Sequence, residues 1–99
     1  PEEMRRLEQR RREFADWFHG YEAILMPAVA VPAIPLAEVD EASPIPGYLT
    51  RPANYLGLCG LAMPSGQSGG LPLGIQLVGL RHEDDRLLST AAWVAAHLD

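Results

Sequence analysis

Apolar side chains recur with helical spacing at the start of the chain. Residues 1–19 therefore predict an amphipathic helix. Its apolar face would hold Met4, Leu7, Phe14, Trp17 and Phe18. Glutamates in the first turn suit the positive end of the helix dipole, and Gly20 suits the residue that caps the other end.

A second helical pattern runs to the other end of the chain, over residues 84–98. Asp84 and Asp85 are typical of a first helical turn. The apolar face is wide, as in a helix that packs against a sheet. It comprises Leu87, Leu88, Ala91, Ala92, Val94, Ala95 and Leu98.

Between these helices, apolar runs predict strands. Residues 23–26 form a short run that ends at Pro27 and indicates a buried strand. Residues 27–46 are rich in proline, which removes backbone donors, and predict an extended surface loop of unusual length. Residues 50–58 predict a short helix, with proline at its start and Gly60 after it.

Two further apolar runs lie within residues 61–80 and predict a β-hairpin. The glycine-rich segment 65–70 (Ser-Gly-Gln-Ser-Gly-Gly) between them is the predicted turn. Pro64 and Pro72 indicate that strand pairing is irregular near this turn. Gln76 is the one amide in a long apolar run, so we expect it to be buried and hydrogen-bonded to a neighbouring loop.

These elements define a layered α/β arrangement in one domain segment over residues 1–99, with too few strands to close a sheet alone. The predicted strands are apolar on both faces, and strands of that kind need neighbours and cover on each side. We therefore expect strand 23–26 to pair with strands from outside the chain, and the fold to be incomplete as a stand-alone domain. Because the chain opens at Pro1 without methionine, we also expect a part upstream of it.

Charge and composition limit the classes of partner. The formal net charge is −5, which disfavours nucleic acid, and we interpret the five arginines between residues 5 and 12 as a solvated helix face. The single cysteine, Cys59, cannot form an internal disulfide and fits a reducing, cytoplasmic compartment. No apolar run reaches the ~20 residues of a membrane span, so no membrane partner is expected.

Few side chains in the sequence suit catalysis or metal binding. The three histidines, His19, His82 and His97, lack metal-ligand spacing, and no metal or cofactor is expected. We interpret Cys59 as a small buried hydrophobe and Asn54 as a helix cap or loop tie. The acidic groups, Asp40 with Glu41 and residues 83–85, are interpreted as a solvated loop and a helix start.

Five stretches, in this order and spacing, resemble the C-terminal region of the amidase signature family. They are Tyr21–Pro27, Arg51–Leu58, Met63–Gly66, Gly70–Gly79 and the helix positions Asp84, Leu87, Leu88 and Ala91. The resemblance spans residues 14–96. It implies the C-terminal part of that family's fold, a mixed sheet flanked by helices, and it implies a hydrolase acting on a small-molecule amide.

The family uses a serine nucleophile, a bridging serine and a lysine base, which lie in its larger N-terminal portion. This chain has no lysine, so no catalytic residue is carried over to it. The serines of segment 65–70 lie where the family has a hairpin turn, and we interpret them as turn residues. The resemblance thus implies a segment that completes the fold and one side of the substrate cleft, and that is inactive alone.

One position departs from the branch of the family that releases ammonia from glutamine for tRNA amidation. That branch is expected to have an acidic residue seven positions before Asn54, where this chain has Gly47. A tRNA-linked role is therefore not implied.

The partner that the resemblance implies is the N-terminal portion of the same amidase or another subunit, with a homo-oligomer also open. The alternative is a non-catalytic interaction module derived from an amidase lobe. An enzyme with an unrelated mechanism would need a clustered acid–base pair, which the acidic groups named above do not offer.

Overall fold

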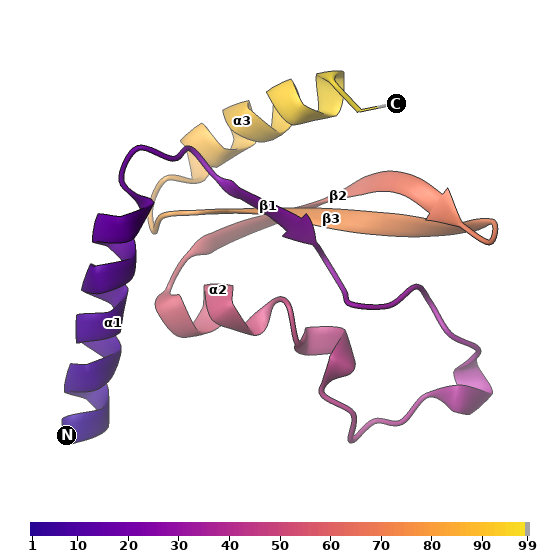
Figure 1. Cartoon of the computed structure of the whole chain (residues 1–99), viewed down its shortest axis with the longest axis horizontal. Coiled ribbons are helices and arrows are strands. Elements are labelled where there is room, and N and C mark those ends of the chain that lie inside the picture. The colour runs from indigo at the N-terminus through magenta and orange to yellow at the C-terminus, as the bar shows by residue number, and fades with distance from the viewer. Residues whose placement is uncertain (99) are drawn as a thin grey trace.

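A computed structural model describes residues 1–98 as a small sheet with helices on both sides (Figure 1). The helices are α1 (Glu2–Phe18), α2 (Arg51–Leu56) and α3 (Asp84–Ala96), with two 3₁₀ turns, η1 (Leu36–Glu38) and η2 (Ile45–Gly47). The strands are β1 (Ile24–Pro27), β2 (Cys59–Ser68) and β3 (Leu71–Gly79). Helix α3 lies on one side of the sheet, and the segment 28–48 with α2 lies on the other (Figure 1).

The three strands form an antiparallel sheet in the order β1-β3-β2. Leu77 of the central strand lies opposite Leu25 on one side and Leu61 on the other. The expectation that β1 finds its neighbours only outside the chain is therefore wrong for one edge. Strand β3 pairs with β1 along one edge and with β2 along the other, whereas the outer edges of β1 and β2 have no partner strand among residues 1–98.

The hairpin turn is shorter than predicted. Strand β2 continues to Ser68, so only Gly69 and Gly70 form the turn, and both have positive φ (57° and 81°). Positive φ at both central residues matches the right-handed twist of a two-residue hairpin, and glycine adopts it without cost. The predicted irregularity is present, because the pairing register shifts between Pro64 and Gln67.

The main core lies between the sheet and α3. Leu77, Leu87 and Ala91 are buried together, and partly buried side chains from β2, α3 and the residue before β1 pack around them. These are Ala23, Cys59, Leu61, Met63 and Val94. The helical period of α3 and the alternation of β2 and β3 bring these residues to one interface, as binary patterning requires.

Helix α1 leaves part of its predicted apolar face uncovered. Phe18 is buried (1% exposed), but Trp17 is 59% exposed and Met4 is exposed as well. The helix packs chiefly on α2 and projects past the end of the sheet (Figure 1). It ends in a turn at Phe18–Tyr21, in which Gly20 has a φ of 96° and the amide of Tyr21 donates to Phe18 O at 3.0 Å.

Helix α2 is short and has a well-defined C-terminal cap. Gly57 has a φ of 69°, and the amide of Leu58 donates to Ala53 O at 2.8 Å while that of Gly57 donates to Asn54 O at 3.3 Å. This pair of bonds is the Schellman arrangement, which needs a left-handed residue after the helix. The helix therefore ends at Leu56, not at residue 58 as predicted, because Gly57 ends it before Gly60 is reached.

The chain is more extended than a complete domain of its size. Its accessible surface is 7508 Å², against about 5,500 Å² for a folded monomer of this mass. Its radius of gyration is 15.6 Å, against about 13 Å for a compact domain of this length. Many large apolar side chains are exposed on it, so this part of an α/β fold is incomplete as a stand-alone domain.

No helix within residues 1–98 combines the length and the apolar character that crossing a membrane requires.

Candidate functional site

A single side chain anchors both ends of the long segment 28–48. The Gln76 amide, on the central strand, donates from Nε2 to Leu49 O at 2.8 Å and to Pro27 O at 3.3 Å. Gln76 is only 5% exposed, and its prediction as a buried, loop-binding amide is confirmed. Because a glutamine amide has two N–H donors, one side chain can serve both carbonyls. The base of the segment is thereby fixed to the sheet.

The anchored segment leads into a groove between α1 and α2. The groove has a volume of about 930 Å³. Its lining is mostly aromatic or aliphatic: Phe14, Tyr48, Leu49, Pro52, Tyr55 and Leu56, with Arg10, Glu13 and Arg51 beside them. The two helices are joined by Arg11, whose Nε donates to Tyr55 O at 3.1 Å. Hydrogen bonds thus hold both walls of this groove, one at Tyr55 and one at Leu49.

The charges at this groove do not cancel. Within residues 1–98, the ion pairs are Arg6 with Glu2 and Arg86 with Glu83, and neither involves Arg10 or Arg51. Glu13 accepts a hydrogen bond from Gln9 Nε2 at 3.1 Å. The groove therefore presents two guanidinium groups and one carboxylate beside an apolar floor, which leaves a net positive charge.

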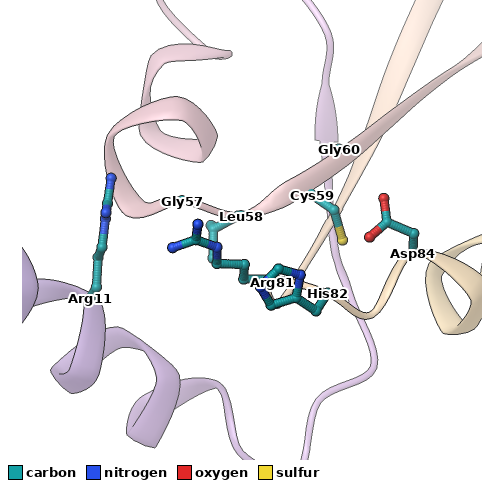
Figure 2. Close-up of a pocket in the computed structure, with 8 residues that line it drawn as sticks. All are labelled: Arg11, Gly57, Leu58, Cys59, Gly60, Arg81, His82 and Asp84. Atoms are coloured by element: carbon teal, nitrogen blue, oxygen red, sulfur yellow. The ribbon is translucent and has the colours of Figure 1, made fainter.

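A second, smaller pocket of about 380 Å³ lies at the junction of β2, α3 and α1 (Figure 2). Its lining includes Arg11, Cys59, Arg81, His82 and Asp84. Burial raises the pKa of the Cys59 thiol, and the nearby Asp84 carboxylate raises it further. The thiol approaches Leu80 O at 3.2 Å. A protonated thiol that packs against the core is a poor nucleophile, which agrees with the interpretation of Cys59 as a small hydrophobe.

The serines of segment 65–70 have no base beside them. Ser65 and Ser68 lie on β2, an edge strand, and line a shallow hollow whose other residues carry no titratable side chain. A serine hydroxyl is a weak nucleophile until a neighbouring base accepts its proton. These two serines therefore lack the surroundings that acyl transfer requires.

The three histidines lie in different parts of the fold. His97 stacks on Trp93 with ring centroids 4.2 Å apart, while His82 lies at the smaller pocket and His19 follows α1. Over residues 1–98, no three histidine, cysteine, aspartate or glutamate side chains come together as a metal site would need.

Two positions singled out from the sequence lie near the groove. Asn54 is exposed on α2, and only its backbone carbonyl takes part in the cap, so its predicted role as a side-chain tie finds no hydrogen bond in residues 1–98. Arg11 ties the two helices at this place instead. Gly47 ends η2, and a Cβ built on it would lie 3.9 Å from Arg51 Nε.

Three groove residues were not predicted as site residues from the sequence, although they have helical spacing. They are Tyr48, Arg51 and Tyr55. Positions i, i+3 and i+7 share one face of a helix, and these three residues line the groove together. The sequence alone does not show that α1 lies across from that face.

The model of the family described as Amidase matches residues 1–88. The chain belongs to the amidase family.

Individual relatives agree with that assignment. A glutamyl-tRNA(Gln) amidotransferase subunit of Lactococcus lactis is 39% identical over 92 residues, which cover 88% of this chain and 18% of the relative. The corresponding protein of Dinoroseobacter shibae is 44% identical over 87 residues, which cover 82% of this chain and 18% of the relative. The chain thus spans about a fifth of the length of the curated relatives it matches.

Solved structures show the same fold. A crystal structure described as an amidase superposes with a TM-score of 0.81 at 33% identity, covering 94% of this chain and 23% of that one. A glutamyl-tRNA(Gln) amidotransferase subunit of Thermotoga maritima gives a TM-score of 0.72 at 30% identity, covering 85% of this chain and 19% of that one. The predicted fold class, part of the amidase signature fold, is confirmed.

Proposed function

We propose that this chain is the C-terminal portion of an amidase, residues 1–99 forming one segment of its domain, and that it completes the fold and one side of the substrate cleft. The observation that carries the proposal is the contrast between a family match over most of the chain and the lack of any lysine in it. The serines of segment 65–70 also stand without a base. No residue of this chain is assigned a catalytic, cofactor-binding or metal-binding role.

The reaction of the complete protein would be hydrolysis of a small-molecule amide. The oxygen of a serine bonds to the acyl carbon, the C–N bond breaks, and the nitrogen takes up a proton and leaves as ammonia or an amine. The oxygen of water then bonds to the acyl carbon, the bond from that carbon to the serine oxygen breaks, and the carboxylic acid leaves while the serine regains its proton. A lysine and the serines supplied by the partner body would move the protons. This chain would contribute the wall that contains the anchored segment 28–48 and α2.

The partner is therefore the N-terminal portion of the same amidase or a separate subunit with that content. Exposed apolar side chains along segment 28–48 support such a partner, because an independent domain rarely exposes so many together. They include Val29, Val31, Ile34, Leu36, Val39 and Ile45. Similar relatives are amidotransferase subunits, and that comparison, with the single free thiol, supports a cytoplasmic location for this chain.

The test compares three preparations on a panel of simple amides: the purified chain, the complete amidase that carries it, and the complete amidase treated with a serine-directed reagent. We expect turnover from the untreated complete protein alone. Reagent-sensitive hydrolysis by the purified chain would overturn the proposal, as would a complete protein that hydrolyses no amide.

A further inference from the structure

We propose that the groove between α1 and α2 binds the carboxylate-bearing, apolar part of the amide substrate. This inference rests on the function proposed above and names the class of substrate. The expected acyl group is an aromatic or aliphatic body with a negatively charged substituent. Three properties of the groove support it: its lining, its charge and the way its walls are held.

The lining and size of the groove fit a small organic ligand. Six aromatic or aliphatic side chains form most of its surface, and its volume of about 930 Å³ lies in the range of ligand pockets, roughly 300–1,000 Å³. Tyr48 is 65% exposed and Tyr55 is exposed too. Tyrosine rings offer a large contact area at little cost in conformational entropy, so an apolar body would gain by covering them.

The positive charge of the groove favours a negatively charged substituent on the ligand. Arg10 and Arg51 line it, and within residues 1–98 neither has an acidic oxygen within ion-pair distance. Glu13, the one acidic residue of the lining, is hydrogen-bonded by Gln9. The Glu13 carboxylate keeps its charge, so the two guanidinium groups leave the groove with a net charge of +1 in a chain of net charge −5, which is a local reversal of sign. A guanidinium group binds a carboxylate through two parallel hydrogen bonds, so a carboxylate is the favoured complement.

The walls of the groove are fixed before a ligand arrives. Arg11 joins α1 to Tyr55 O, and Gln76 holds Leu49 O. Gly47 has no side chain beside Arg51, so the guanidinium group is not crowded from that direction. Preorganisation of this kind lowers the entropic cost of binding.

The experiment uses the complete amidase and two matched sets of probes. Calorimetry compares 4-ethylbenzoate with the neutral 4-ethylbenzyl alcohol. Steady-state kinetics compare 3-phenylpropanamide with its para-carboxylate and its para-aminomethyl derivatives. The variants are Arg51→Gln and Arg10→Gln, and the matched control is Arg5→Gln, an exposed α1 arginine outside the groove.

We expect 4-ethylbenzoate to bind roughly tenfold more tightly than the alcohol, as a charge-assisted hydrogen bond would give. We expect kcat/KM to be highest for the para-carboxylate derivative, intermediate for 3-phenylpropanamide and lowest for the para-aminomethyl derivative. Either groove variant should remove most of the preference for the carboxylate, and Arg5→Gln should leave it unchanged. Circular dichroism and thermal melting of each variant in the complete amidase show whether the variants are folded.

Other outcomes separate this inference from the function on which it rests. If neutral amides are hydrolysed but the carboxylate preference is absent, or survives in both groove variants, the groove assignment is wrong and the amidase proposal stands. If neither probe binds, the groove is filled by the partner body and the assignment is again wrong. If no amide is hydrolysed, the proposed function fails, whatever the probes do.

Discussion

The two faces of the sheet are stabilised by different means. On the α3 face, Leu77, Leu87 and Ala91 form a buried apolar cluster. On the opposite face, segment 28–48 is almost entirely exposed and is fixed at its base by the two hydrogen bonds of Gln76. The α3 face is buried within the chain, whereas the face that carries segment 28–48 is held in position but remains exposed. The difference indicates where the rest of an amidase would be added.

Removal of the core side chain should have the largest effect. Leu77→Ala creates a cavity at the centre of the α3 face, and we expect it to lower the free energy of unfolding by about 3 kcal/mol. Urea unfolding of the purified chain, followed by tryptophan fluorescence at a concentration low enough to keep it monomeric, measures this. Leu36→Ala is the control on the other face, because Leu36 is 88% exposed, and should change stability by less than about 0.5 kcal/mol. Equal losses from both variants would contradict the contrast between the faces.

Loss of the Gln76 amide should have the second-largest effect on stability. Gln76→Leu keeps the size of the side chain but leaves Pro27 O and Leu49 O without their donor, at a cost of about 2 kcal/mol. Thermolysin should then cut segment 28–48 faster, since its base is released. Gln67→Leu, at an exposed position of β2, provides the control. Unchanged stability and an unchanged cleavage rate would show that the amide does not hold the segment.

A smaller effect is expected at the end of α2. Gly57→Ala places a Cβ in a left-handed residue, 3.3 Å from the Arg11 guanidinium, and should cost about 1 kcal/mol. It should also disturb the bond from Arg11 to Tyr55 O. Gly60→Ala is the matched control, because Gly60 has no positive φ and the nearest atom to its Cβ is at 4.0 Å. Differential scanning fluorimetry gives the melting temperature of each variant, and equal shifts in melting temperature would argue against this explanation of the cap.

The smallest effect concerns the thiol of Cys59, which packs against the core on the α3 face and reports on its burial. Its pKa is raised in the folded chain, so at mildly alkaline pH less thiolate is present than in the unfolded chain. Iodoacetamide should therefore label the folded protein more slowly than the same protein in urea. Because the folded pKa lies above the unfolded one, stability from this group is complete at low pH and is lost as pH rises through the folded pKa. Labelling at equal rates would show that the thiol is neither buried nor affected by Asp84.

The sequence was sufficient where local rules decide the structure. Helical spacing placed α1 and α3, and the isolated amide in an apolar run predicted the environment of Gln76. Prediction failed where a choice depended on pairing between distant segments. The partner of β1 is β3, and the turn is Gly69–Gly70 because β2 keeps pairing past its register shift. The groove was missed for the same reason, since the contact between α1 and α2 joins residues far apart in the sequence, as in the Arg11–Tyr55 bond.

The central claim is that the loop face of the sheet belongs against a larger amidase body. Sedimentation velocity of the purified chain tests it most directly, because the surface in question is then left without its partner. The account predicts self-association or aggregation that depends on concentration, together with binding of an apolar dye. A compact monomer at all concentrations, with a cooperative melt and no dye binding, would contradict it.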